Sequence, residues 1–176
     1  MSHIQYPENF SKFLIGKKYP SLKAENSKTN AYAVLSLISQ ARHNIDLFTP
    51  DLDPRILNSK KIAQAITHFV KVSPNSRFRI LVSDPSIAIK QGHQLIELAR
   101  RFSSFISIRE TNEEYRTTPF NLMMVDSKAL IFRPHANEYQ AIVDYNASYD
   151  CRRHLEFFNL VWERSESSTE MRQLFI

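Results

Sequence analysis

Glycine and cysteine are scarce in this chain, and each shortage bears on function. Only two of the 176 residues are glycine, Gly16 and Gly92, so a glycine-rich loop that cradles nucleotide phosphates is excluded. The single cysteine, Cys151, has no partner for an internal disulfide, which favours a reducing compartment, and we interpret it as structural. No apolar run approaches the roughly 18–20 residues of a membrane span. We expect a cytoplasmic protein without a membrane span, a cofactor or a metal.

Positive charge is concentrated near the N-terminus. The chain carries 23 Lys and Arg against 18 Asp and Glu, a net charge of +5. Residues 1–30 contain five lysines and two glutamates, whereas the rest of the chain is close to balance. This distribution favours a salt-sensitive attraction to nucleic acid or another anion. A role in solubility alone explains the charge equally well.

From residue 31 onward, helical and strand patterns alternate and then give way to consecutive strands. Apolar spacing predicts helices over 31–41, 60–71, 87–102 and 151–164. Runs of β-prone residues predict strands at 45–49, 78–82 and 105–108, a hairpin over 120–132 and a strand at 141–145. Alternation predicts parallel pairing, and consecutive strands predict antiparallel pairing. The predicted fold class is α/β, with a mixed β-sheet flanked by helices on both faces.

Three parts are predicted along the chain. Residues 1–30 form a basic N-terminal arm, 31–165 a single α/β domain and 166–176 a polar tail. The arm mixes aromatic residues with lysines, so we expect it to pack on the domain or on a second copy of the chain. One short helical turn is expected at 10–15.

The order of these elements resembles a single unit of the phospholipase D superfamily, over residues 31–165. The corresponding segments are a helix and strand over 35–48, the alternating run 78–84 and a last helix with Phe158 and Trp162. The resemblance implies a His-x-Lys-x4-Asp motif in a strand pair after the third α/β unit. In that family the histidine attacks phosphorus and the lysine holds the phosphoryl oxygens.

The matching stretch of this chain is Asp126-x-Lys128-x4-Arg133. Asp126 takes the histidine position and Arg133 the aspartate position, so only Lys128 keeps the residue type of the motif. A carboxylate beside a phosphodiester repels it, and the usual nucleophile is missing. The resemblance therefore implies a domain that is more readily a binding module than an enzyme.

Lys128 and Arg133 are the first candidate anion contacts. Lys128 lies at the turn of the predicted hairpin, where it either contacts a phosphate or is an ordinary exposed turn residue. Arg133 either offers a guanidinium fork to an anion or forms a salt bridge with Asp126 or Asp144. We favour the salt bridge slightly.

His135, Asn146 and Ser148 are further candidates for the same site. His135 lies two residues beyond Arg133, and a histidine relocated from the motif, His135 or the more distant His93 or His154, would have to supply the nucleophile. The resemblance implies a serine and asparagine pair near the phosphate, which Ser148 and Asn146 would supply, although an ordinary strand-to-helix turn explains them better. Asp51 and Asp53 follow a strand next to prolines and fit a turn and helix cap better than a cation site.

Three functions are compatible with these features. The first is a non-catalytic phospholipase D-like domain that binds an anionic, phosphate-containing ligand, such as nucleic acid, near Lys128 and Arg133. The second is a scaffold for protein docking or for a homodimer. The third is a phosphodiesterase or nuclease with a relocated nucleophile. We favour the first, and the sequence leaves the ligand and the oligomeric state open.

Overall fold

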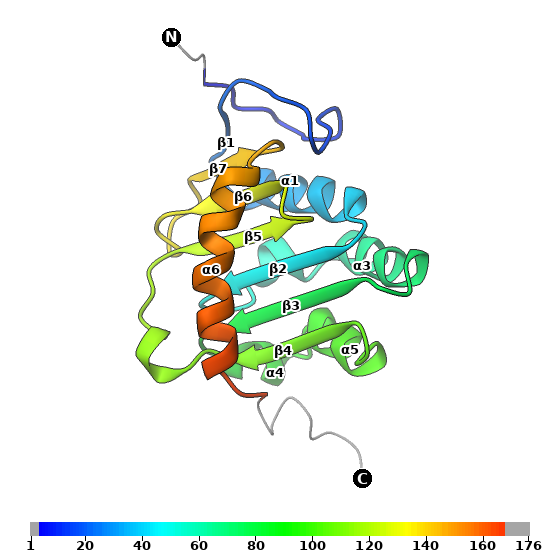
Figure 1. Ribbon diagram of the computed structural model, residues 1–176, viewed down its shortest axis with the longest axis vertical. Helices are drawn as coiled ribbons and strands as arrows, with labels where there is room; N and C mark the ends of the chain where they lie inside the picture. Colours follow the sequence, from blue (N-terminus) through cyan, green and yellow to red (C-terminus); the bar gives the residue numbers. More distant parts are fainter. Residues whose placement is uncertain (1–3, 168–176) are drawn as a thin grey trace.

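A single seven-stranded β-sheet forms the centre of the computed structural model, which describes residues 4–167 (Figure 1). The strands are β1 Leu22–Ala24, β2 Asn44–Thr49, β3 Arg77–Val82, β4 Ile106–Glu110, β5 Asn121–Val125, β6 Ala129–Arg133 and β7 Ala141–Asp144. Their order across the sheet is β1-β7-β6-β5-β2-β3-β4. β2, β3 and β4 are parallel, and the remaining pairs are antiparallel.

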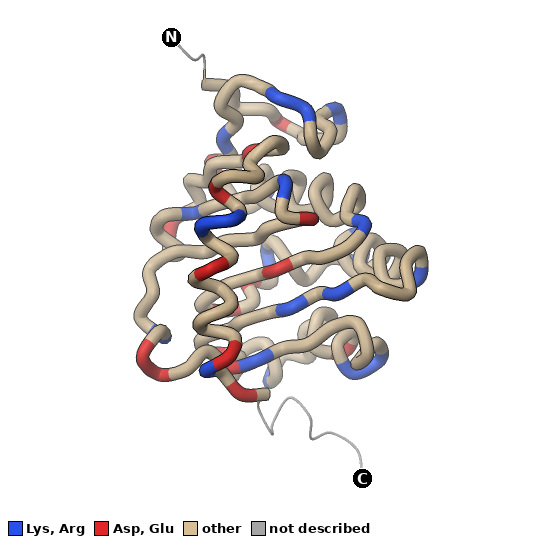
Figure 2. The backbone as a smooth tube through the Cα atoms, in the orientation of Figure 1, with Lys and Arg blue, Asp and Glu red and all other residues tan. Residues whose placement is uncertain are grey.

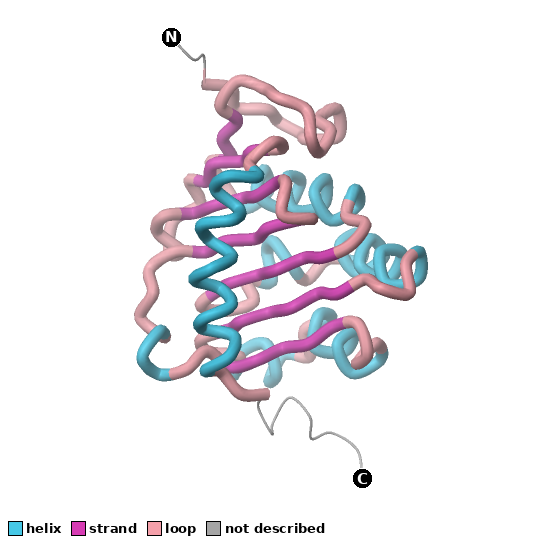
Figure 3. The backbone as a smooth tube through the Cα atoms, viewed as in Figure 1, coloured by secondary structure: helices cyan, strands magenta, loops and turns pink. Residues whose placement is uncertain are grey.

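Helices cover both faces of the sheet. They are α1 Ser27–Gln40, α2 Pro54–Leu57, α3 Lys60–Val72, α4 Ser86–Gln91, α5 Gln94–Arg101 and α6 Ser148–Arg164, with a 3₁₀ turn at Glu113–Tyr115. Figure 3 shows α6 on one face, with the short 3₁₀ turn on the same side, and the other helices behind the sheet. The predicted fold class is therefore confirmed. None of the helices within residues 4–167 is long and apolar enough to cross a membrane.

Alternation along the central strand divides the core into two layers. Ile45 and Leu47 of β2 pack toward α1 and α3, whereas Phe48 packs toward α6. Asp46 also points toward α6, and its buried carboxylate pairs with Arg79 at 2.7 Å. A buried charge needs such a partner because the interior solvates it poorly.

The direction of the strands defines two edges of the sheet. The carboxyl edge is the side where β2, β3 and β4 end, and the amino edge is the side where they begin. β5 starts at the carboxyl edge with Asn121, turns at the amino edge, and returns as β6, which ends opposite Asn121 with Arg133. The helices α1, α3 and α5 each precede a parallel strand, so all three end at the amino edge.

The segment predicted as an arm is built into the domain. Phe10 and Phe13 are buried in the main core, where Phe13 packs against Tyr19 and Tyr145. Gln40 holds this segment, since its side chain accepts a hydrogen bond from the backbone N–H of residue 15 and donates one to the carbonyl of residue 13, both at 2.9 Å. Residues 10–16 form turns instead of the expected helical turn, and β1 adds an edge strand to the sheet. The boundary at residue 30 therefore does not separate an arm from the fold.

Two other boundaries differ from the prediction. The helix expected over 87–102 is divided into α4 and α5, because Gly92 adopts a left-handed φ of 69° that ends α4. His93 then starts α5, and its Nδ1 accepts a hydrogen bond from the N–H of Leu95 at 3.1 Å. The predicted tail at 166–176 lies outside the described residues except for Glu166, which bridges to Glu110, and residue 167.

Protonation of His93 should make stability depend on pH. His93 is 2% exposed, and its burial lowers the pKa from 6.5 to about 4. Between these values the unfolded chain binds a proton that the folded chain does not, so the free energy of unfolding falls as the pH falls, by up to about 3 kcal/mol. Urea unfolding at several pH values between 7 and about 4 measures this loss.

The matched variant is His93→Asn, because asparagine keeps a helix-capping oxygen but does not titrate. Its stability should fall less steeply with pH than that of the wild type. Equal slopes for the two proteins would show that another group causes the dependence.

Candidate functional site

The predicted site residues lie at opposite ends of the β5–β6 hairpin. Asp126 and Lys128 belong to the turn at the amino edge, whereas Arg133 ends β6 at the carboxyl edge. Five strand residues of about 3.4 Å each place Lys128 and Arg133 about 17 Å apart along the strand. One phosphate group therefore cannot contact both, and the combined Lys128/Arg133 site that we predicted is not formed.

The other candidates divide in the same way. His135 follows β6 at the carboxyl edge and is exposed. Asn146 and Ser148 follow β7, which ends at the amino edge near Lys128, whose carbonyl accepts a hydrogen bond from the N–H of residue 147. The N–H of Asn146 donates to Asp144 Oδ1 at 2.8 Å, as in an ordinary strand-to-helix turn.

The hairpin turn itself has a defined geometry. Asp126 and Ser127 both have φ of 52°, in the left-handed region. The N–H of Lys128 donates to the carbonyl of Val125 at 3.0 Å, which closes a β-turn with Asp126 and Ser127 at its centre, and pairing resumes at Ala129. Two left-handed central residues match the twist of antiparallel strands, and aspartate tolerates this conformation better than most residues.

The carboxylate of Asp126 is saturated by the backbone of the α1–β2 connection. Its Oδ1 accepts hydrogen bonds from the N–H groups of His43 at 2.7 Å and Asn44 at 3.0 Å, and its Oδ2 accepts one from Arg42 at 2.9 Å. These three bonds tie the end of α1 to the hairpin turn. Asp126 is therefore an anchor for the backbone, and this corrects its predicted role as a ligand contact.

An open groove of about 790 Å³ lies beside this turn at the amino edge. We call it the hairpin groove; its walls are residues 14–16, the connection 39–43, the end of α3 and the hairpin turn. Arg42 and Lys128 line it, and neither forms a salt bridge with a carboxylate of residues 4–167. The exposed apolar side chains of Leu14 and Val72 add to its walls. The groove is thus open, partly apolar and cationic.

Charge is distributed unevenly between the edges of the sheet. Figure 2 shows Lys and Arg gathered on the side where β2, β3 and β4 begin, with acidic segments more frequent along α6 and the opposite edge. Arg42, Lys71 and Arg101 lie at or next to the ends of α1, α3 and α5, and Arg77 begins β3, all at the amino edge. Anions are therefore attracted to this side of the molecule.

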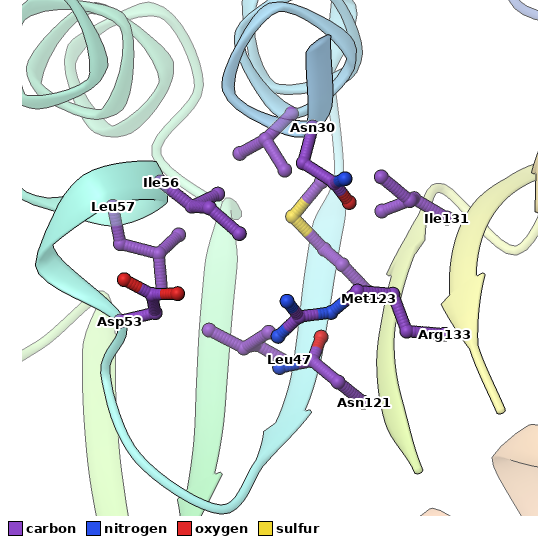
Figure 4. Close-up of a pocket in the computed structure, with 10 residues that line it drawn as sticks. Asn30, Leu47, Asp53, Ile56, Leu57, Asn121, Met123, Ile131 and Arg133 are labelled. Carbon is purple, nitrogen blue, oxygen red and sulfur yellow. The ribbon is translucent and has the colours of Figure 1, made fainter. Parts of the chain in front are cut away.

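A small cavity lies at the carboxyl edge, beside Arg133. Its volume is about 20 Å³, room for about one water molecule. Asn30, Asp53, Asn121 and Arg133 provide its polar lining (Figure 4). Arg133 is only 3% exposed, and its guanidinium lies 5.5 Å from the ring centre of Tyr139. A phosphate group does not fit in the space that remains.

Acidic groups compensate the buried arginine. Burial lowers the pKa of Arg133, and the nearby groups Asp53, Tyr139 and Asp51 oppose that shift. Burial, together with the charge of Asp53, raises the pKa of Asp51. The acidic neighbours of Arg133 are thus Asp51 and Asp53, while Asp126, proposed as its partner, lies at the other edge. These carboxylates repel an incoming anion.

Asp53 also has a structural role, as its turn pattern predicts. Its Oδ1 accepts a hydrogen bond from the N–H of Arg55 at 2.9 Å and caps α2, and its Oδ2 accepts one from the hydroxyl of Tyr139 at 2.8 Å. No group of three His, Cys, Asp or Glu side chains within the described part of the chain is placed to hold a metal ion.

Sequence reasoning missed the residues that join Lys128 in the hairpin groove. Arg42 follows α1, and His68 lies near the end of α3, far from the motif in sequence. The available signal was topological: helices that precede parallel strands end at one edge, and a hairpin entered from the opposite direction turns at that same edge.

Comparison with solved structures identifies the fold. TrmBL2, described as an archaeal chromatin protein with a novel mode of DNA binding, matches with a TM-score of 0.61 and 15% identity over 84% of this chain and 54% of its own. Nuc from Salmonella typhimurium, a phospholipase D family member, matches with a TM-score of 0.54 and 16% identity, over 77% of this chain and 88% of Nuc. NucT from Helicobacter pylori matches with a TM-score of 0.56 and 10% identity, over 81% of this chain and 92% of NucT. The phospholipase D-like fold is confirmed, and this chain spans about half the length of TrmBL2.

Two comparisons concern the sequence alone. No curated protein matches the chain. Residues 26–174 match the family described as Domain of unknown function (DUF7931). The match starts at the residue that caps α1 and includes both edges of the sheet described above.

Removal of the Asp126 carboxylate should destabilise the protein. Asp126→Ala leaves three backbone N–H groups without their acceptor and puts alanine in a left-handed conformation, so we expect a loss of about 2–4 kcal/mol in the free energy of unfolding. Asp126→Asn keeps one carbonyl oxygen and the tolerance for this φ, and should lose less. Urea unfolding measures both. A loss for Asp126→Ala no larger than that for Glu156→Ala, on the exposed side of α6, would contradict the anchoring role.

The thiol of Cys151 should be unreactive in the folded protein. It is buried, it lies 3.5 Å from the carbonyl oxygen of Ala129, and its burial raises the pKa to about 12. A thiol reagent at pH 8 should label the urea-unfolded chain rapidly and the native chain only as fast as it opens. Rapid labelling of the native protein would refute the structural interpretation.

Proposed function

The chain belongs to the DUF7931 family, and we propose that it is a non-catalytic phospholipase D-like domain that binds a phosphate-containing polyanion, nucleic acid, in the hairpin groove. The observation that carries this proposal is the open cationic groove at the amino edge. Lys128 and Arg42 line it from the two segments that Asp126 ties together. The DNA binding described for TrmBL2 is compatible with this ligand.

The motif positions support the absence of catalysis in either of two registers. In the first, Asp126 takes the histidine position. The spacing also fits Pro119-x-Asn121-x4-Asp126, which retains the aspartate. We favour this second register because its first two positions flank the start of one strand, where residues i and i+2 share a face, whereas Asp126 and Lys128 straddle a turn. Histidine is missing from both registers, so the attacking group of the family has no counterpart at the motif.

The second register also explains why the ligand of this chain would bind at the amino edge and not at the motif, which in this register begins at the carboxyl edge. Its positions 119 and 121 lie at the carboxyl edge, next to the one-water cavity. The side chain of Arg133 occupies that edge, and the carboxylates of Asp51 and Asp53 beside it repel a bound phosphate. The hairpin groove has the space and the charge that this cavity lacks.

The two other functions considered from the sequence stay predictions. A relocated nucleophile at His135 would act on the exposed carboxyl edge, beside a cavity whose lining includes no lysine to hold a phosphoryl oxygen. A docking or dimerisation scaffold has no defined contact surface among the described residues that would favour it over ligand binding.

Binding is tested by fluorescence anisotropy with labelled oligonucleotides at low and moderate salt. Removal of two phosphate contacts in Arg42→Ala/Lys128→Ala should weaken binding about tenfold or more and reduce the slope of log K against log salt by about 1.5. The matched control is Arg55→Ala/Lys90→Ala, which removes the same charge from exposed residues outside the groove.

The possible outcomes test the position of the site, the identity of the ligand and the absence of catalysis separately. Weaker binding only in the groove variant, with the oligonucleotide recovered intact, supports the proposal. Equal loss in the control variant would contradict the site, absence of binding by the wild type at low salt would contradict the ligand, and cleavage would contradict the non-catalytic role.

A further inference from the structure

A second groove of about 500 Å³ lies between α3 and α5, on the face opposite α6. We call it the helix groove. The residues that α3 contributes recur every three or four positions and so form one face along the whole helix: Lys60, Ala63, Gln64, Thr67, His68 and Lys71. The groove therefore extends over about 16 Å, because eleven residues of helix rise about 1.5 Å each.

The helix groove is also cationic. Lys60 lies at one end, and Lys71 and Arg101 lie at the other, all exposed. No carboxylate within residues 4–167 forms a salt bridge with these three side chains. The acidic lining residue, Glu97, is paired with Arg100 at 2.8 Å. Its charge is therefore largely compensated, and the groove keeps a positive potential.

The two grooves meet at the end of α3. His68 lines both, Lys71 lines the helix groove, and the next residue, Val72, lines the hairpin groove and is 66% exposed. The cations therefore follow a continuous path from Lys60 through Lys71 to Lys128. This path is too long for one phosphate group, whereas repeated phosphates along a chain match repeated cations along a path.

We propose that a single nucleic-acid strand occupies both grooves, passing over the end of α3 from the hairpin groove to the helix groove; this deepens the proposed function and rests on it. A single strand is flexible enough to follow two grooves on either side of a helix end. A duplex is stiff over this distance and does not bend sharply enough to follow both grooves.

Contact is made to the sugar-phosphate backbone and not to the bases. Apart from the imidazoles of His43 and His68, the aromatic ring that lines the hairpin groove is that of Phe69, which is buried, and the lining of the helix groove contains no Phe, Tyr or Trp. An exposed Phe, Tyr or Trp ring of the kind that stacks on unpaired bases is therefore missing from both grooves in the described structure. Binding depends on strand length and salt, with little dependence on base composition.

The test compares strands of about 4 and about 16 nucleotides, the range of known single-strand site sizes. Lys60→Ala/Lys71→Ala/Arg101→Ala should weaken binding of the longer strand about tenfold or more while leaving the shorter strand within about twofold. Arg42→Ala/Lys128→Ala should weaken both. The matched control, Lys28→Ala/Arg55→Ala/Lys90→Ala, removes three exposed cations outside the grooves and should bind both strands like the wild type.

Each failure has a distinct form. If the helix-groove variant binds the longer strand like the wild type while the hairpin-groove variant does not, the extended path is wrong and the proposed function stands. If the wild type binds neither strand, both fail. Equal affinity for a duplex of the same length, or equal displacement by polyglutamate, would overturn the assignment to a single nucleic-acid strand.

Discussion

The contact between the Asp126 carboxylate and three consecutive backbone N–H groups is the interaction on which the amino edge depends. It joins the end of α1 to the tip of the β5–β6 hairpin, two segments more than 80 residues apart in sequence. Arg42 and Lys128 are held beside one groove as a result. In the proposed function, Asp126 therefore acts indirectly, by fixing the backbone that carries the cations.

The two edges of the sheet have opposite properties. At the carboxyl edge, where ligands of α/β proteins usually bind, the buried Arg133 and Asp53 line a cavity of about 20 Å³, and Asp51 lies nearby. At the amino edge, the ends of α1 and α3 and the hairpin turn surround the open hairpin groove, and the helix groove extends from there along α3 and α5. On the proposed function, a phospholipase D-like fold without the motif histidine still presents a surface suited to phosphates.

The sequence predicts the fold well because the periodicity of apolar residues reports directly on which face is buried. It predicts the site less well, because spacing along the chain does not reveal which end of a strand a residue occupies. Lys128 and Arg133 are five residues apart in sequence, but β6 runs between them and places them at opposite edges of the sheet. The break at Gly92 was missed because one glycine within an apolar pattern resembles a tolerated helical residue. The lysines before residue 30 favoured an arm outside the domain, although Phe10 and Phe13 of this segment are buried in the core.

The central claim is that the ligand binds at the amino edge, and backbone amide chemical shifts measured during titration with a single-stranded oligonucleotide test it most directly. The account predicts shifts at residues 42–44, 68–73 and 126–129, which line the hairpin groove or adjoin it. Signals at residues 133–139, near the cavity of Arg133, should stay unchanged. Shifts confined to residues 51–55 and 133–139 would place the ligand at the carboxyl edge and contradict the account.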